Sequence, residues 1–223
     1  MESAAGSEAS GTRLVAVYER TISASVARIW ENVLDWDHLP WLHRSSFTGV
    51  ELLEESAAGW RGWVASRGRR ASSESLVDVR LDRPALRYLT HTAEGSGKGT
   101  EIWTRVEPIG ERITKIAVEF HAPDLGAEEG KRLGAAYVEL YARLWSEDEA
   151  MMVRRQAVLD ESGGRLARAA RDFAPVPLGP FAALRARLPL VIRAHGREPR
   201  FLELDGEIVA HPTVCPHLGG PLA

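Results

Sequence analysis

Two histidines five positions apart carry the clearest capacity for metal chemistry in this sequence. They close the segment ENVLDWDHLPWLH, residues 31–43, in which Asn32, Asp35, His38 and His43 have the spacing Asn-x2-Asp-x2-His-x4-His. Two imidazoles and one carboxylate on one face of an Fe(II) ion leave positions open for dioxygen and a substrate. On a helical wheel Asn32 and Asp35 lie opposite the apolar stripe, so they either face solvent or lie on a face that another domain or subunit covers. The alternative to a metal site is a solvated helix face followed by two surface histidines.

A second candidate group lies near the end of the sequence, where residues 215–222 are CPHLGGPL. This string resembles the first half of a Rieske iron–sulfur loop, whose cluster has two thiolates on one iron and two imidazoles on the other. The resemblance implies that Cys215 and His217 each bind one iron, with glycines that let the backbone approach the sulfides. The alternative is a lone buried cysteine beside an unrelated histidine.

Residues 32–43 are similar to the mononuclear iron motif of Rieske-type non-haem iron oxygenases, including the proline between the two histidines. The resemblance implies that His38 and His43 are iron ligands. It also implies that Asp35 connects toward the Rieske histidine for electron transfer and that Asn32 lies near the iron. A five-residue gap is awkward on an unbroken helix, so a kink at Pro40 is expected to bring the imidazoles together.

The third iron ligand is expected on the long helix, since family members place a carboxylate there. The segment Trp-Ser-Glu-Asp-Glu at 145–149 offers Asp148, which interrupts an apolar stripe between Leu144 and Met151. A carboxylate on an apolar face is costly unless it is paired, hydrogen-bonded or bound to a metal. Glu147 is nearly as well placed, and an ordinary acidic patch on a helix is the alternative to both.

The elements that must position these residues form an α+β pattern. It predicts a strand over 13–22, a helix from Val26 to Leu34, a short helix over 37–43 and about six antiparallel strands over 47–120, the last with Thr114, Ile116, Val118 and Phe120 on one face. A long helix to about Asp160 follows, and the two glycines at 163 and 164 are expected to end it. This order resembles the START-like helix-grip fold over residues 13–160, in which a curved sheet wraps the long helix around an apolar cavity. Candidate cavity walls are Trp60, Trp63 and Trp103.

Outside this catalytic domain, residues 1–12 are expected to be a disordered tail and residues 161–187 a linker. Residues 189–193, 200–204 and 207–210 are expected to be three short strands. Residues 188–223 resemble the N-terminal part of a small all-β Rieske domain. The Cys-x-x-His that would complete the cluster does not occur in the sequence, so the [2Fe-2S] ligand set is incomplete. Whether Ala223 is the natural end is left open. The domain order is the reverse of that in the usual oxygenase.

Composition limits the partners and the location of the protein. A net charge of −3 gives no basic field for nucleic acid or an anionic membrane, and no apolar run approaches the roughly 18 residues of a membrane span. The single cysteine excludes an intrachain disulfide, and the first residues lack the features of a signal peptide. These observations favour a cytoplasmic protein.

The resemblance implies an oxidoreductase that uses O2 to hydroxylate or oxidatively demethylate an apolar, aromatic or polycyclic small molecule. Electrons are expected from an NAD(P)H-dependent reductase, directly or through a ferredoxin, and a homo-oligomer is a further expectation. The alternative is a START-like carrier of a hydrophobic ligand, or a polyketide-cyclase-like protein, fused to a Rieske electron-transfer module. The fold hosts all of these activities and does not choose among them.

Overall fold

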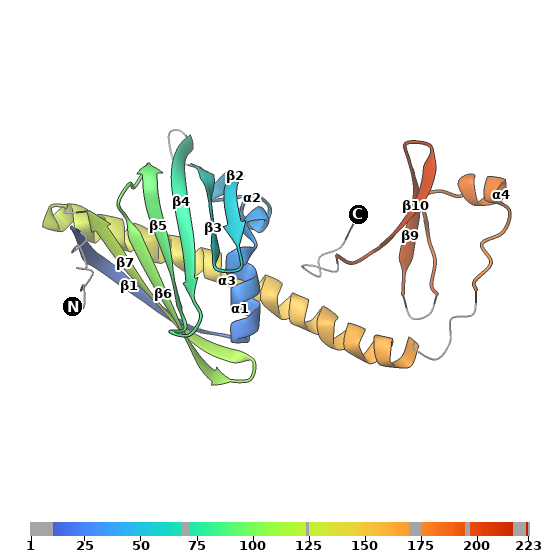
Figure 1. Cartoon of the computed structure of the whole chain (residues 1–223), viewed down its shortest axis with the longest axis horizontal. Helices are drawn as coiled ribbons and strands as arrows, with labels where there is room; N and C mark the ends of the chain where they lie inside the picture. Colours follow the sequence, from blue (N-terminus) through green and yellow to red (C-terminus); the bar gives the residue numbers. More distant parts are fainter. Residues whose placement is uncertain are drawn as a thin grey trace, which may run out of the picture. The chain divides into compact units, whose positions relative to one another are not determined.

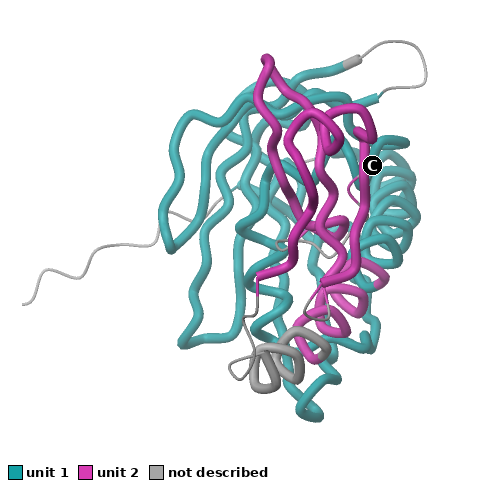
Figure 2. Tube along the Cα trace, turned by 90° about the vertical axis from the view of Figure 1, so that its right-hand side faces the viewer, with its two compact units in different colours: residues 1–149 teal, residues 150–223 magenta. Residues whose placement is uncertain are grey.

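The computed structural model describes residues 11–67, 72–123, 125–169, 175–194, 197–215 and 222, with side chains omitted for 161–169. The chain divides into two compact units, residues 1–149 and 150–223, which Figure 2 colours separately. Each unit is described by itself.

The first unit is built on one seven-stranded antiparallel sheet that curves around a long helix (Figure 1). The strand order is β1-β7-β6-β5-β4-β3-β2, so the chain returns to pair its last strand with its first. The strands are β1 (Thr12–Ile22), β2 (Phe47–Ser56), β3 (Gly59–Arg67), β4 (Ser72–Asp82), β5 (Arg87–Gly95), β6 (Glu101–Gly110) and β7 (Ile113–Pro123).

Alternation along the strands creates the inner face of this sheet. In β7 the residues Thr114, Ile116, Val118, Phe120 and Ala122 are all buried, while the residues between them are not. Side chains two residues apart point to the same face of a strand, and β-branched residues suit that pleated, half-buried surface. The alternation predicted from the sequence for this strand is confirmed.

Short helices connect β1 to β2 and carry the histidine motif. Helix α1 (Val26–Leu34) begins at Ser25, whose hydroxyl accepts from the backbone N–H of Arg28. A 3-10 turn η1 (Trp36–His38) and the one-turn helix α2 (Leu39–Leu42) follow. The proline at position 40 stands in the first turn of α2, where its missing N–H costs no hydrogen bond. The single short helix expected over 37–43 is therefore two turns of different type.

Helix α3 (Ala127–Ala169) runs along the concave side of the sheet in its first half (Figure 1). Its register is fixed where Gly134 meets β1, because a Cβ added there would lie 2.4 Å from the carbonyl oxygen of Val15. Gly130, one turn earlier, has only the Val15 side chain near its own Cβ position, at 3.6 Å. The helix continues past Asp160 into the segment expected to be a linker.

Replacing Gly134 with alanine is expected to destabilise the first unit by about 2 kcal/mol, because backbone must shift to admit the methyl group. Gly130→Ala is the matched control and is expected to stabilise by up to about 1 kcal/mol, since alanine favours helix without a clash. Urea unfolding followed by tryptophan fluorescence measures both, because all seven tryptophans lie in this unit. Equal effects of the two variants would refute the close approach.

The second unit contains the end of α3, helix α4 (Phe181–Arg185) and a small antiparallel sheet of order β10-β9-β8. Its strands are β8 (Leu190–Val191), β9 (Pro199–Leu204) and β10 (Glu207–Pro212), close to the three short strands expected from the sequence. These strands do not show a Rieske domain. Residues 216–221, which hold most of the CPHLGGPL string, lie outside the described residues.

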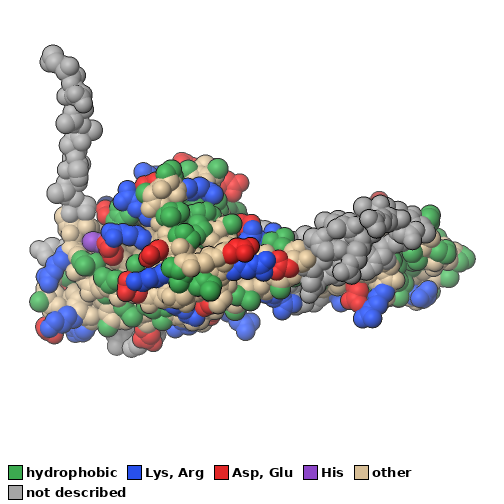
Figure 3. Space-filling view, turned by 90° about the horizontal axis from the view of Figure 1, so that it is seen from below, with side chains coloured by type: hydrophobic (Ala, Val, Ile, Leu, Met, Phe, Trp, Pro, Cys, Tyr) green, Lys and Arg blue, Asp and Glu red, His purple; other side chains and the backbone are tan. Residues whose placement is uncertain are grey.

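Figure 3 shows one face of the molecule, on which basic and acidic side chains of the first unit are interspersed. This mixture agrees with the small net charge. None of the helices in the part of the chain that the structure describes is long and apolar enough to cross a membrane.

Candidate functional site

His38, His43 and Asp148 converge at one end of the first unit. Among the described residues they form a group in which one ligand atom of each lies within 4.8 Å of the others, and all three are buried. Oδ1 of Asp148 is 3.0 Å from Nε2 of His43 and 3.6 Å from Nε2 of His38. The histidines come from η1 and the C-terminus of α2, and the carboxylate from α3, so residues far apart in the sequence meet.

The backbone before η1 orients His38. Its Nδ1 hydrogen-bonds the carbonyl oxygen of Asp35, which ends helix α1. A backbone carbonyl only accepts, so Nδ1 carries the proton and Nε2 presents its lone pair toward Asp148. The turn between α1 and η1 therefore fixes both the ring direction and the tautomer of His38.

Glu147 orients His43 in the same way from the opposite side. The Nδ1–H of His43 donates to Oε2 of Glu147 over 2.6 Å, and its Nε2 faces Asp148. The two candidate third ligands thus have different places: Asp148 meets both Nε2 atoms, whereas Glu147 meets the outer nitrogen of one ring. Metal-binding histidines typically donate their second N–H to such an acceptor.

When both histidines are neutral, the converging atoms repel one another unless a proton or a metal ion lies between them. Oδ1 of Asp148 is buried and faces Nε2 of His43 over 3.0 Å. The two Nε2 atoms that face it are acceptors when the histidines are neutral. Ligand atoms bound at right angles to one ion, each at about 2.1 Å, lie about 3 Å apart. The observed 3.0 Å and 3.6 Å separations therefore fit a shared divalent metal.

Protonation of the two imidazoles differs because their surroundings differ. Burial lowers the pKa of His38, and the nearby charges of Asp148 and Asp35 offset this only in part. Burial also lowers the pKa of His43, but contacts with Asp148 and Glu147 outweigh burial and raise the pKa overall. His38 is thus a ready metal ligand near neutral pH, while a proton on His43 competes with a metal.

Asn32 and Asp35 lie inside the first unit and line the cavity described below. Their position on α1 opposite its apolar stripe left two expectations, a solvent-facing pair or a face covered by another domain or subunit. Both expectations are wrong, because the cavity of the same unit covers that face. Oδ1 of Asn32 is buried and accepts no hydrogen bond from the described residues. Catalytic roles for Asn32 and Asp35 stay predictions.

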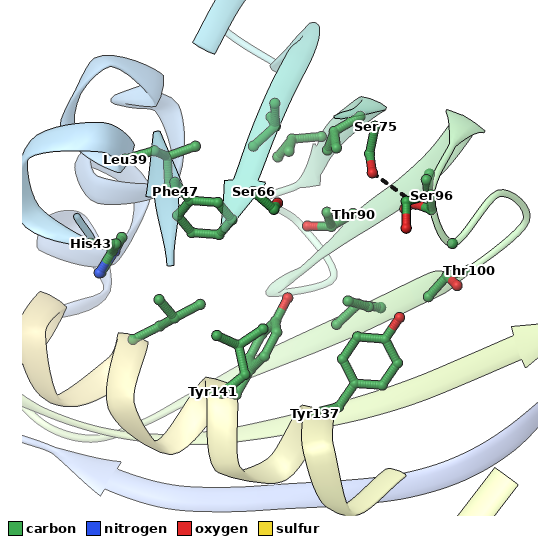
Figure 4. A pocket seen from close by; sticks show the side chains of 18 of the residues that line it. Leu39, His43, Phe47, Ser66, Ser75, Thr90, Ser96, Thr100, Tyr137 and Tyr141 are labelled. Carbon is green, nitrogen blue, oxygen red and sulfur yellow. Dashed lines mark hydrogen bonds between the residues drawn. The ribbon is translucent and has the colours of Figure 1, made fainter. Parts of the chain in front are cut away.

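A cavity of about 690 Å³ begins at this group and extends between α3 and the sheet (Figure 4). Apolar side chains near the histidines include Leu39, Phe47 and Leu144. Of the three tryptophans expected as cavity walls, Trp60 lines the cavity and Trp63 and Trp103 do not. A cavity of this size takes a small organic molecule, whose apolar surface would replace water.

The sequence analysis did not identify several of the residues that line the cavity. Tyr88 and Tyr141 line it, and burial raises the pKa of both phenols, which therefore remain neutral hydrogen-bond donors. Hydroxyl side chains on β4 and β5 also face it. The signal was present as serines and valines at every second residue of β4 and as Tyr88, Thr90 and Thr92 on one face of β5. Without the fold, such a pattern is typical of any strand with one polar face.

Of the two proposed cluster ligands in the second unit, the structure describes one. Cys215 is half-buried, and His217 lies outside the described residues. Their role as [2Fe-2S] ligands stays a prediction.

Comparison with known proteins identifies the first unit. The family described as polyketide cyclase / dehydrase and lipid transport matches residues 13–144. A comparison with curated protein sequences gave no significant match.

Three solved structures resemble the chain. The Zhui aromatase/cyclase from Streptomyces sp. R1128 is 15% identical with a TM-score of 0.54, covering 65% of this chain and 95% of its own. TTHA0849 from Thermus thermophilus is 20% identical with a TM-score of 0.51, covering 60% and 94%. The ginseng major latex-like protein 151 is 13% identical with a TM-score of 0.51, covering 63% and 97%. At these identities the likeness establishes the helix-grip fold alone.

Proposed function

We propose that the first unit of this chain, which belongs to the polyketide cyclase / dehydrase and lipid transport family, binds an apolar, ring-containing small molecule and oxidises it at a mononuclear non-haem iron. His38, His43 and Asp148 would hold Fe(II), since two imidazoles and a carboxylate with open positions suit that ion. The observation that carries the proposal is the meeting of these three buried ligand atoms at the end of the cavity.

When bound, ferrous iron supplies the capacity to activate dioxygen. The residues of the chain orient the metal ligands and bind the substrate. The carbonyl of Asp35 and the carboxylate of Glu147 hold the two imidazoles with their Nε2 atoms toward Asp148. Leu39, Phe47 and Leu144 exclude water from the adjoining cavity and hold an apolar ring against this end. Electrons would come from an NAD(P)H-dependent reductase, directly or through a ferredoxin.

Anaerobic loading with ferrous ammonium sulfate tests the proposal. The wild-type chain is expected to retain about one iron per chain after desalting, and nitric oxide should give the electron paramagnetic resonance signal of a high-spin iron–nitrosyl. His38→Ala is expected to lose both, because one of three ligands is gone. Wild-type protein that retains no iron, or His38→Ala that retains as much, would refute the iron site.

A metal-free carrier or cyclase is the second candidate, and the family match together with the fold of an aromatase/cyclase favours it. In that case the raised pKa of His43 would make it a proton donor held by Asp148 and Glu147. A metal-free carrier or cyclase would show ligand binding or ring closure that persists unchanged after dialysis against a strong chelator.

A further inference from the structure

The cavity has a second, polar end that the iron chemistry does not use. On α3, Tyr137 precedes Asp148 by 11 residues, which is about 16 Å along the axis and close to three full turns. Both side chains therefore lie on one face of the helix, and both line the same cavity. A ligand that spans the cavity meets the histidine group at one end and Tyr137 toward the other.

Two hydroxyl groups come together at this remote end. A Cβ built on Gly97 would lie 3.6 Å from Oγ1 of Thr100 and 3.9 Å from the hydroxyl of Tyr137, so both hydroxyls flank one glycine. Figure 4 shows the Tyr137 hydroxyl directed up into the cavity on the side where Thr100 lies, away from His43.

Both hydroxyls are held in place by the fold. The Tyr137 ring stacks on Phe120 with centroids 5.1 Å apart and planes 1° from parallel. Thr100 is buried, and its backbone N–H donates to the carbonyl of Gly97 over 3.0 Å. Groups that are fixed before binding lose little entropy when they bind a ligand.

The sheet repeats this change in polarity along the cavity. On β4 the lining residues pass from Ser73 and Ser75 to Val77 and Val79. The hydroxyl of Ser75 donates to the carbonyl of Ser96 over 2.7 Å, which leaves its oxygen able to accept. Buried polar groups favour partners that satisfy their hydrogen bonds, so this end disfavours a plain hydrocarbon.

We infer that the ligand is an elongated ring compound with a hydroxyl or carbonyl oxygen at the end remote from the histidine group. Tyr137 and Thr100 hydrogen-bond that oxygen, and the apolar end lies against Leu39 and Phe47. This inference rests on the proposed function in one respect: the iron site determines which end of the ligand reacts. The preference for an oxygen at the remote end is a property of the cavity and is measurable without iron.

Fluorescence titration of chelator-treated protein with anthracene and 2-hydroxyanthracene tests the inference. Wild-type protein is expected to bind the hydroxylated compound about tenfold more tightly, the effect of roughly one net hydrogen bond. Tyr137→Phe keeps the stacked ring and is expected to reduce the preference to within about twofold, with anthracene affinity unchanged; Thr100→Val should reduce it in part. Tyr18→Phe, on β1 outside the cavity, is the matched control and keeps the full preference.

Equal affinity of wild-type protein for the two compounds would overturn the inference, as would binding of neither or a preference that survives Tyr137→Phe. Iron retention by Tyr137→Phe is measured in parallel and is expected to equal that of wild type. A failure of the polar end therefore shows in the ligand titration, and a failure of the iron site shows in iron retention.

Discussion

Asp148→Ala is expected to lower the affinity for Fe(II) by more than about 100-fold, a larger loss than removal of an outer-shell partner causes. Asp148 supplies the only carboxylate oxygen within reach of both Nε2 atoms among the described residues. Without it, two imidazoles remain as the ligands, and no carboxylate on the Nε2 side of the rings binds the divalent ion directly. Competition with a chromophoric chelator under anaerobic conditions measures the change.

The neighbouring residue provides a sharp comparison. Glu147 contacts the outer nitrogen of His43, so Glu147→Ala is expected to weaken Fe(II) binding by only about 10-fold to 100-fold. Glu147→Gln should restore most of this loss, because an amide oxygen still accepts from Nδ1–H. Glu139→Ala, at an exposed position of the same helix, is the control and should change nothing. A greater loss in Glu147→Ala than in Asp148→Ala would reverse the assignment of ligand and positioning residue.

The order of elements in the first unit was predictable because its signals are local. Alternation in β7 and the apolar stripe of α3 appear within one segment each, and hydrophobic periodicity reports them directly. The pairing of β1 with β7 is long-range, and no local pattern in either strand predicts it. The end of α3 was misplaced because the two glycines at positions 163 and 164 were taken as a stop, and the helix continues to Ala169.

The sequence identified which residues form the candidate site but not how their side chains are arranged in space. Asp148 and Glu147 are adjacent on a helix and differ by about 100° in direction. Which of them faces the histidines depends on how α3 is turned against the sheet, and Gly134 fixes that turn through its contact with β1. The helical wheel of α1 correctly placed Asn32 and Asp35 on the face opposite the apolar stripe. In a fold with an internal cavity that face need not be exposed to solvent, and here it lines the cavity.

The resemblance to Rieske-type oxygenases implied more about this protein than the comparisons with known proteins support. The family match and the helix-grip neighbours support the first unit as a ligand-binding fold. They do not support a Rieske domain, a reductase or ferredoxin partner, or oxygenase activity. The small sheet of the second unit agrees with the three expected strands, and a cluster domain there stays a prediction.

Blocking the middle of the cavity is expected to separate ligand binding from metal binding. Thr90 lies on β5 between Val79 and Ile102, and Figure 4 shows its side chain between His43 and Thr100. Thr90→Trp would place an indole in the space that an elongated ligand must cross, and a close-packed wall cannot move aside without strain. We expect affinity for anthracene and 2-hydroxyanthracene to fall more than about tenfold, since the ligand must give up its apolar contacts.

The three proposed iron ligands lie on other elements, so Thr90→Trp is expected to retain Fe(II) as wild type does. His91→Trp adds the same indole at the next residue of β5, and successive side chains of a strand point to opposite faces. That variant is expected to bind both ligands normally. If Thr90→Trp binds them as tightly as His91→Trp, the two ends are not joined by a path that the ligand occupies. Coupled loss of iron and ligand in Thr90→Trp would instead mean that the wall of the cavity also supports the histidines.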